Sequence, residues 1–424
     1  MSTDVNKSSA FTAYLNKLYA VGSFMLFSFF SGIMNIYVGG TQQMLSNVYH
    51  LHAPAFSELT ASLFFSTGLG CVVGGTLLDR YGAGVISFIF SLVATIGLAL
   101  FALNQDFLGF FYSEFIIGLG ISIWYPAGMV ALKYHFKPKE LPFMAGVLLF
   151  FNYLGAACIS IVVYTSATMG LFNTNLFVFT IAFLCTFYFY FTWSVNNTAT
   201  HYTPIPLAED YYNQLRTMRN WIALPLIIAQ TIASVFSYVY LPLWSIPYLS
   251  LLLTPLQAGT ITSACLIIYG LSGVILGRFY HKYFSPMVWM TLQNAISLLL
   301  FSLLIYLPSS YLNFTSVSLI LYGVSILRGA SSTYTATYLA DLFEKRYTGT
   351  ISAIYAYFFQ FIISGITPVF GIILANTSQG EPFTLADYNS ALQYVALAFV
   401  ITTFATTVLQ KVVTYYPKVI KLDD

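Results

Sequence analysis

Residues 75–82 read Gly75-Thr76-Leu77-Leu78-Asp79-Arg80-Tyr81-Gly82. This segment stands between two apolar stretches, at about residues 57–78 and 84–103. Each stretch is long enough to cross a bilayer once, because a spanning helix needs about 20 apolar residues. The Asp-Arg pair ends a long run without charged residues, and the glycine that follows permits a tight turn. The segment therefore predicts a short polar loop between two membrane-spanning helices.

The composition extends this prediction to the whole chain. Of the 424 residues, 58% are hydrophobic and only 7% are charged, whereas an average soluble domain is about 25% charged. Because so few charges cannot cover a soluble fold, lipid must surround most of the surface. The apolar stretches lie at about 18–40, 57–78, 84–103, 107–132, 142–165, 171–194, 221–246, 257–277, 287–307, 313–340, 349–374 and 389–410. We therefore expect an all-α membrane protein with twelve transmembrane helices.

Polar segments and basic residues predict how these helices are organised. The longest hydrophilic stretch, residues 195–220, would link a six-helix bundle at 1–194 to a second one at 221–424. With the N-terminus inside, 15 of the 16 Lys and Arg fall in inner segments, and Arg328 lies within a span. Because inner loops carry the excess of Lys and Arg, both termini are predicted to be cytoplasmic. We expect an integral multi-pass protein of a bacterial inner (plasma) membrane.

The opening segment matches a known motif. In the major facilitator superfamily, the loop between the second and third helices reads G-x-x-x-D-R-x-G, followed by basic residues. The chain resembles this motif at Gly75, Asp79, Arg80 and Gly82. Ala83 and Gly84 stand where the family has Arg or Lys. The resemblance implies two pseudo-symmetric six-helix bundles, and a gating role in which Asp79 and Arg80 latch the inner face closed.

A carboxyl group, Glu114, lies inside the fourth predicted span. Many superfamily members have R-x-x-x-G-x-G at this place, so Glu114 replaces their Arg, and the resemblance implies that this helix lines the central cavity. A charge inside a span is costly and is usually functional. Glu114 shares one predicted helix face with Gly118, Ser122 and Tyr125. We predict that Glu114 couples transport to protons or contacts the substrate, for example the amine of an amino acid. Alternatively, it reaches the outer interface and has only a structural role.

Arg328 lies about fifteen residues into the tenth predicted span. Because its guanidinium is always charged, it needs a partner, a water-filled cavity or an anionic group of a substrate. It either binds substrate or takes part in gating, or it forms a structural ion pair. Further candidates for substrate binding are Asn35, Tyr125, Asn152, Gln230, Tyr238, Ser331 and Gln360, all on expected cavity helices. Each of these could instead hydrogen-bond between helices.

The sequence contains no phosphate-binding loop, HExxH motif, nucleophile elbow or histidine cluster. We therefore expect a transporter and not an enzyme, with no cofactor, no metal ion and no nucleic-acid partner. Its expected partners are a small-molecule substrate, protons as coupling ion and the lipid bilayer. We expect a monomer.

Two finer resemblances concern the substrate. Residues 143–146 (Phe-Met-Ala-Gly), 152–156 (Asn-Tyr-Leu-Gly-Ala) and 385–392 resemble the phagosomal nutrient-transporter family of intracellular bacteria. This resemblance implies proton symport of an amino-acid-like or related nutrient. Residues 125–126 (Tyr-Pro) and 134–136 (Tyr-His-Phe) resemble monocarboxylate and oxalate/formate carriers, which implies an organic-anion exchanger or facilitator without proton coupling. A transport-dead sensor or assembly subunit is a third hypothesis, which the short loops disfavour.

Overall fold

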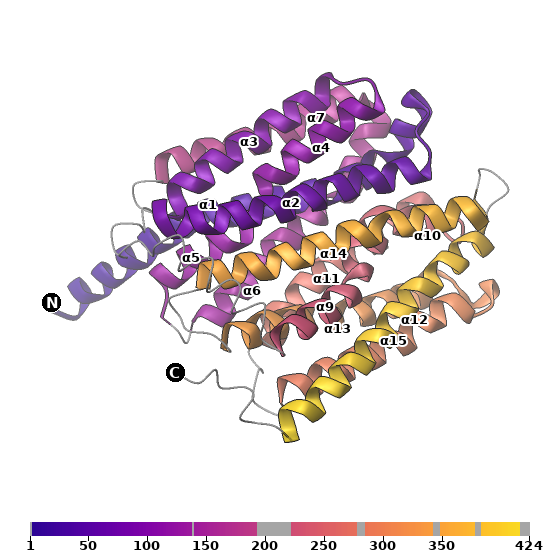
Figure 1. Ribbon diagram of the computed structural model, residues 1–424. Coiled ribbons are helices and arrows are strands. Elements are labelled where there is room, and N and C mark those ends of the chain that lie inside the picture. The colour runs from indigo at the N-terminus through magenta and orange to yellow at the C-terminus, as the bar shows by residue number, and fades with distance from the viewer. Residues whose placement is uncertain are drawn as a thin grey trace.

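The computed structural model describes residues 2–137, 140–192, 222–277, 285–341, 348–377 and 383–415. Nearly every residue in these ranges is helical, which confirms the all-α prediction. The helices lie in two groups that meet along one long boundary (Figure 1). The predicted linker, residues 195–220, lies outside the described residues, so the division of the chain at this linker stays a prediction.

The first group of helices precedes the predicted linker. It consists of α1 (Ser2–Tyr49), α2 (Ala53–Tyr81), α3 (Ala83–Leu103), α4 (Phe107–Ile121), α5 (Trp124–His135), α6 (Leu141–Ala156) and α7 (Ile159–Thr192). Gly82 separates α2 from α3, because its φ of 85° is a conformation that glycine adopts without strain. Asp106 caps α4 by accepting a hydrogen bond from the Gly109 N–H at 2.8 Å. The conformation of Gly82 shows that the tight turn predicted after Asp79 and Arg80 is present.

The second group of helices follows the predicted linker. It consists of α9 (Ala223–Ala233), η2 (Phe236–Trp244), α10 (Ser245–Leu249), α11 (Pro255–Gly277), α12 (Pro286–Tyr306), η3 (Ser309–Tyr311), α13 (Phe314–Asp341), α14 (Thr348–Thr377) and α15 (Leu385–Tyr415). The element η2 is a π-helix that contains Pro242. Because proline has no N–H to donate, Pro242 removes one bond of the regular α pattern at this point.

Eleven helical stretches of the described residues are long and apolar enough to cross a membrane. One of them, Phe143–Thr192, has 50 residues, far more than the about 20 that one crossing needs. Gly170 interrupts this stretch with φ 81° and ψ 169°, so it consists of two successive helices. When this stretch is counted as two helices, the described residues contain twelve helical stretches that can each cross the membrane, as the sequence predicts.

The two groups pack together chiefly through two pairs of helices. α2 lies along α14, and α6 lies along α11 (Figure 1). Within the first group α1 packs against α6 and α7, and within the second α12 packs against α13 and α15. Large apolar side chains such as Phe404, which is 72% exposed, point outward. Such exposure is expected where lipid rather than water surrounds the helices.

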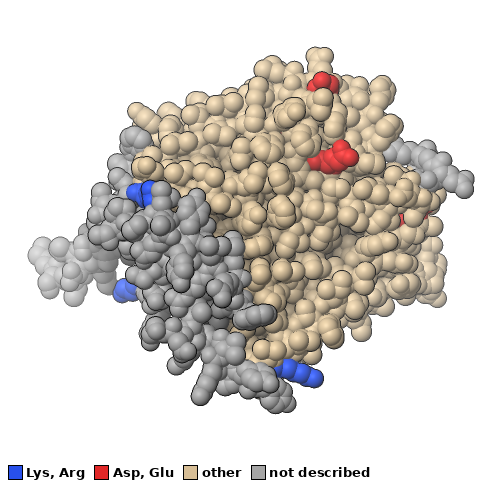
Figure 2. Space-filling model, in the orientation of Figure 1, with Lys and Arg blue, Asp and Glu red and all other residues tan. Residues whose placement is uncertain are grey.

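Most of the charged side chains that Figure 2 shows lie toward one end of the molecule or the other. Figure 2 shows Lys and Arg at the end where α1 begins and α15 ends, and Asp and Glu toward the opposite end. Following the predicted orientation, we name these the inner end and the outer end. The basic residues that Figure 2 shows therefore lie at one end, as the positive-inside rule requires.

Candidate substrate-binding site

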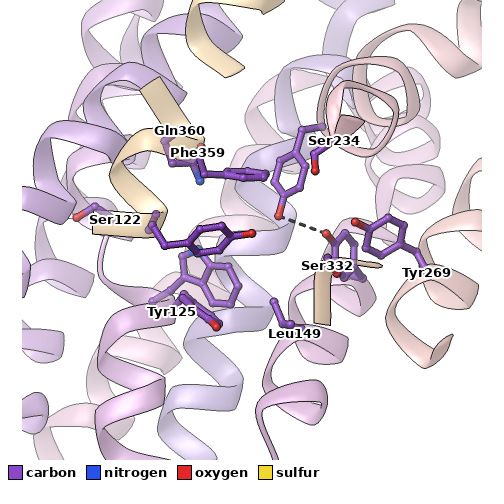
Figure 3. A pocket seen from close by; sticks show the side chains of 13 residues that line it. Ser122, Tyr125, Leu149, Ser234, Tyr269, Ser332, Phe359 and Gln360 are labelled. Carbon is purple, nitrogen blue, oxygen red and sulfur yellow. Dashed lines mark hydrogen bonds between the residues drawn. The ribbon is translucent and has the colours of Figure 1, made fainter. Parts of the chain in front are cut away.

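A pocket lies between the two groups of helices, with about 580 Å³ of empty space, including space open to solvent. Its walls come from the junction of α4 and α5, and from α6, η2, α11, α13 and α14. They are formed by Ser122, Trp124, Tyr125, Leu149, Tyr153, Ser234, Tyr238, Tyr269, Ser332, Tyr355, Ala356, Phe359 and Gln360. Figure 3 shows Ser122 and Tyr125 on one side of this space and Ser234 and Tyr269 on the other. None of these lining residues is charged.

Aromatic rings make up most of the pocket wall. The rings of Tyr153 and Tyr269 are 4.2 Å apart between centroids, and those of Tyr238 and Phe359 are 4.8 Å apart. The Tyr153 hydroxyl donates to the Tyr238 hydroxyl at 3.3 Å, the dashed line in Figure 3. Such a wall offers apolar faces with hydroxyl groups at their edges. It suits a solute with an apolar or aromatic body and a few polar groups.

A break between α4 and α5 brings two of the lining residues to the pocket. Pro126 cannot donate a hydrogen bond to the carbonyl of Ser122, four residues earlier, so the regular helix ends at Ile121 and begins again at Trp124. The Cys71 thiol donates to the freed Ser122 carbonyl at 3.1 Å. The break turns Ser122 and Tyr125 toward the pocket, whereas Gly118 packs against α2.

Arg328, on α13, lies directly behind the pocket wall and is 0% exposed. Its Nη2 donates to the hydroxyl of Ser234, a lining residue, at 3.4 Å. Its Nη1 donates to Asn294 Oδ1 at 2.5 Å, to Gln230 Oε1 at 3.5 Å and to the Ser331 hydroxyl at 3.5 Å. Its Nε has no hydrogen-bond partner. No Asp or Glu of the described chain pairs with this guanidinium, so its charge has only neutral partners.

The predicted substrate-binding residues take different places. Tyr125, Tyr238 and Gln360 line the pocket, and Gln230 and Ser331 contact Arg328. The remaining two candidates, Asn152 and Asn35, do not line the pocket. The Asn152 amide donates to the Ser28 carbonyl at 3.0 Å and thus joins two helices, and Asn35 is half-buried.

The structure also adds residues that the sequence did not single out. These are the pocket residues Trp124, Tyr153, Tyr269, Tyr355 and Phe359, together with Asn294 beside Arg328. The high aromatic content was a signal for the rings, but it is equally typical of aromatic belts at membrane interfaces. Asn294 could have been noticed as an amide within a predicted span.

Glu114 is 1% exposed and does not line the pocket. Its two carboxyl oxygens have no hydrogen-bond partner, and it interacts electrostatically with Tyr37 of α1. The predicted face that joined Glu114 to Tyr125 is interrupted by the break after Ile121. The role of Glu114 in proton coupling stays a prediction.

The residues of the predicted gating motif lie at the inner end of α2. Gly75 is so close to α14 that a Cβ atom there would lie 2.6 Å from Cβ of Ala353. Arg80 is half-buried, and the side chain of Asp79 lies outside the described part of the structure. The latch between Asp79 and Arg80 therefore stays a prediction. In the described ranges, no group of three or more His, Cys, Asp or Glu could hold a metal ion.

Both the sequence and the fold are similar to known proteins. A family model described as Major Facilitator Superfamily matches residues 20–368. The crystal structure of the human organic anion transporter MFSD10 (TETRAN) superposes with a TM-score of 0.65 at 12% sequence identity, covering 93% of this chain and 98% of that chain. No curated protein matches significantly. At this identity, the likeness between the two structures concerns the fold alone.

Proposed function

Because the chain belongs to the major facilitator superfamily, it is a secondary transporter, and we propose that it carries a small organic anion whose carboxylate pairs with Arg328. The apolar or aromatic body of this solute lies between the rings of the pocket. The observation that supports this proposal most directly is a buried guanidinium with only neutral partners behind the pocket wall.

Charge compensation is the physical basis of the proposal. A buried ion is stable only when charges or hydrogen bonds compensate the lost water. The bonds from Arg328 to Gln230, Ser331 and Ser234 are 3.4 to 3.5 Å long, near the limit of a hydrogen bond. Neutral oxygens at such distances compensate a full positive charge only in part. An anionic solute that reaches past Ser234 supplies the missing negative charge, and it does so only while bound.

An amino-acid-like substrate is the second candidate, and Gln360 favours it. This residue lines the pocket, and its Oε1 is buried without a hydrogen-bond partner. An ammonium group could donate to that oxygen and rest against the tyrosine rings through cation–π attraction. Because Glu114 does not line the pocket, it does not serve as the partner of this ammonium group in the arrangement described.

A matched pair of solutes tests the substrate class. We expect a monocarboxylate to bind at least about 30-fold more tightly than its primary amide, since a hydrogen bond to a charged group contributes about 2 kcal/mol. Binding is measured as the rise in the thermal unfolding midpoint of the purified protein with solute concentration. A panel of aliphatic and aromatic acids, with the corresponding α-amino acids, separates the two candidates. Equal stabilisation by the acid and its amide would contradict an anionic substrate.

We further propose that Glu114 carries the coupling proton. Glu114→Gln keeps the size of the side chain but cannot bind and release a proton. In proteoliposomes we expect this variant to lose the accumulation of solute that an inward proton gradient drives. It should still exchange solute across the membrane by counterflow when no gradient is applied. Glu58→Gln, at an exposed site near the outer end, serves as the control and is expected to behave like the parent. Full gradient-driven uptake by Glu114→Gln would contradict the coupling role and favour an exchanger or facilitator.

A further inference from the structure

Three buried polar residues form a cluster inside the first group of helices, away from the pocket. They are Tyr37 of α1, Glu114 of α4 and Asn175 of α7, each at most 1% exposed. None of them lines the pocket. The Tyr37 hydroxyl donates to Asn175 Oδ1, and Glu114 lies within electrostatic range of Tyr37 without a hydrogen bond to it. The neighbouring Phe101 ring packs edge-on against Tyr37 at 5.4 Å.

The unused hydrogen-bonding groups of this cluster are complementary. Both carboxyl oxygens of Glu114 and the Nδ2 of Asn175 have no partner. A protonated Glu114 is a donor, and the Tyr37 hydroxyl can accept one bond while it donates to Asn175. An ionised Glu114 is an acceptor only, and it competes with Asn175 for the single hydroxyl proton of Tyr37. The partner of Tyr37 therefore depends on one proton at Glu114.

No other charged group faces this cluster from the described helices around it. α3 and α7 contain no Asp, Glu, Lys, Arg or His. In α2 the charged residues are Glu58, which is exposed near the outer end, and the Asp79-Arg80 pair at the inner end. From α1 the facing titratable group is Tyr37, with Tyr49 farther toward the outer end against Phe110. Among the described helices around this cluster, Glu114 is thus the carboxyl group that faces Tyr37 and Asn175.

Two residues beyond Tyr37, α1 meets the second group of helices backbone to backbone. A Cβ atom on Gly39 would lie 1.9 Å from the carbonyl oxygen of Pro242 and 3.1 Å from Cα of Leu243, both in η2. On the other side of α1, Gly40 packs against Val162 of α7. Any shift of α1 relative to α7 near Tyr37 therefore changes the contact between Gly39 and Pro242. Rare π-helical segments such as η2 are found frequently at functional sites.

We propose that Glu114, Tyr37 and Asn175 form a proton-linked relay that sets the position of α1 and thereby opens or closes its contact with η2. Protonated Glu114 leaves the Tyr37 hydroxyl on Asn175, which holds α1 against α7 and keeps the contact closed. Ionised Glu114 draws this hydroxyl away from Asn175, and the contact opens. Tyr37 and Asn175 are positioning residues that act through α1. This inference rests on the proposed proton coupling and adds how the proton acts at a distance from the pocket.

Cysteine accessibility at the contact tests the relay without any substrate. The four native cysteines are replaced by alanine, and Leu243→Cys, at a site 2% exposed, is labelled with a charged maleimide in nanodiscs. Leu256→Cys, at a site 82% exposed, corrects for the pH dependence of the thiol itself. We expect the corrected labelling rate to rise about 10-fold between about pH 6 and about pH 9, within the usual range of allosteric coupling.

The variants of the three residues have distinct expected results. Glu114→Gln should label equally slowly at both pH values. Tyr37→Phe and Asn175→Leu both lose the bond between Tyr37 and Asn175 and should label fast at both pH values. Asn175→Ser removes the same amide group and replaces Asn175→Leu if the latter does not fold. Tyr188→Phe removes a hydroxyl that donates to the Tyr19 carbonyl at the inner end of α7, and it should keep the response of the parent.

Failure of the relay and failure of proton coupling give different results. A pH response that survives Tyr37→Phe overturns the relay, whatever Glu114→Gln does in gradient-driven uptake. A parent without any pH response at Leu243→Cys also overturns the relay, while loss of gradient-driven uptake in Glu114→Gln would still uphold coupling through Glu114. Unchanged gradient-driven uptake in Glu114→Gln overturns the proposed coupling itself.

Discussion

Arg328→Gln is expected to lower the uptake of an anionic substrate by about 30-fold or more, because removing one partner of a buried charge pair costs about 2–5 kcal/mol. Glutamine is shorter than arginine, and it removes the positive charge while keeping a hydrogen-bonding amide at this site. Initial rates of uptake into proteoliposomes measure the effect. The thermal unfolding midpoint of the substrate-free variant should not fall, since the change removes a buried charge that has only neutral partners.

Two control variants separate charge from geometry at this site. Arg328→Lys keeps the positive charge but lacks the planar fork that binds a carboxylate through two bonds, so we expect an intermediate uptake. Lys411→Gln removes an exposed basic residue near the end of α15 and should have no effect. A variant Arg328→Gln that unfolds at a clearly lower temperature but transports normally when folded would show that Arg328 has a structural role.

Much of the fold could be predicted because charges are rare in this chain. Gaps between charged residues located the spans, and the break at Gly170 lies between the spans predicted at about 142–165 and 171–194. The same scarcity singled out Arg328, and its complete burial agrees with a position deep in a span. These predictions depend only on the cost of placing a charge in lipid.

The pocket could not be predicted in the same way, because its position depends on local breaks in the helices. A single continuous helix would place Glu114, Gly118, Ser122 and Tyr125 on one face. In the structure the helix ends at Ile121 and begins again at Trp124. The residues after the break therefore face a different direction from those before it. Pro126 was visible in the sequence, but its effect on the direction of the helix was not.

The tyrosine residues of the pocket could not be singled out in the sequence, because the chain contains so many aromatic residues. The chain has 33 Tyr and 39 Phe, so a single ring such as Tyr269 or Tyr355 carries no signal until its neighbours are known. Asn294 is a similar case, since an amide in a span most often joins two helices. Its contact with Arg328 links residues 34 positions apart, and no local pattern predicts such a pair.

Gly155→Ala is expected to destabilise the protein by about 3 kcal/mol, at the upper end of the usual cost of overpacking. A Cβ atom at Gly155 would lie 1.9 Å from the Phe29 carbonyl oxygen, and one at Gly32 would lie 1.8 Å from that of Asn152. α1 and α6 are therefore in backbone contact at two points. Forcing them apart would also break the bond from the Asn152 amide to the Ser28 carbonyl.

A matched substitution on α14 makes this last prediction specific to the contact between α1 and α6. A Cβ atom placed on Gly365 would have no neighbouring atom within 4 Å, so Gly365→Ala meets open space. This change should leave stability unchanged or raise it by about 0.5–1 kcal/mol, since alanine favours helix more than glycine does. Thermal unfolding in detergent compares the two variants. Because the two changes are chemically identical and differ only in what surrounds the new methyl group, equal effects of both would refute backbone contact between α1 and α6.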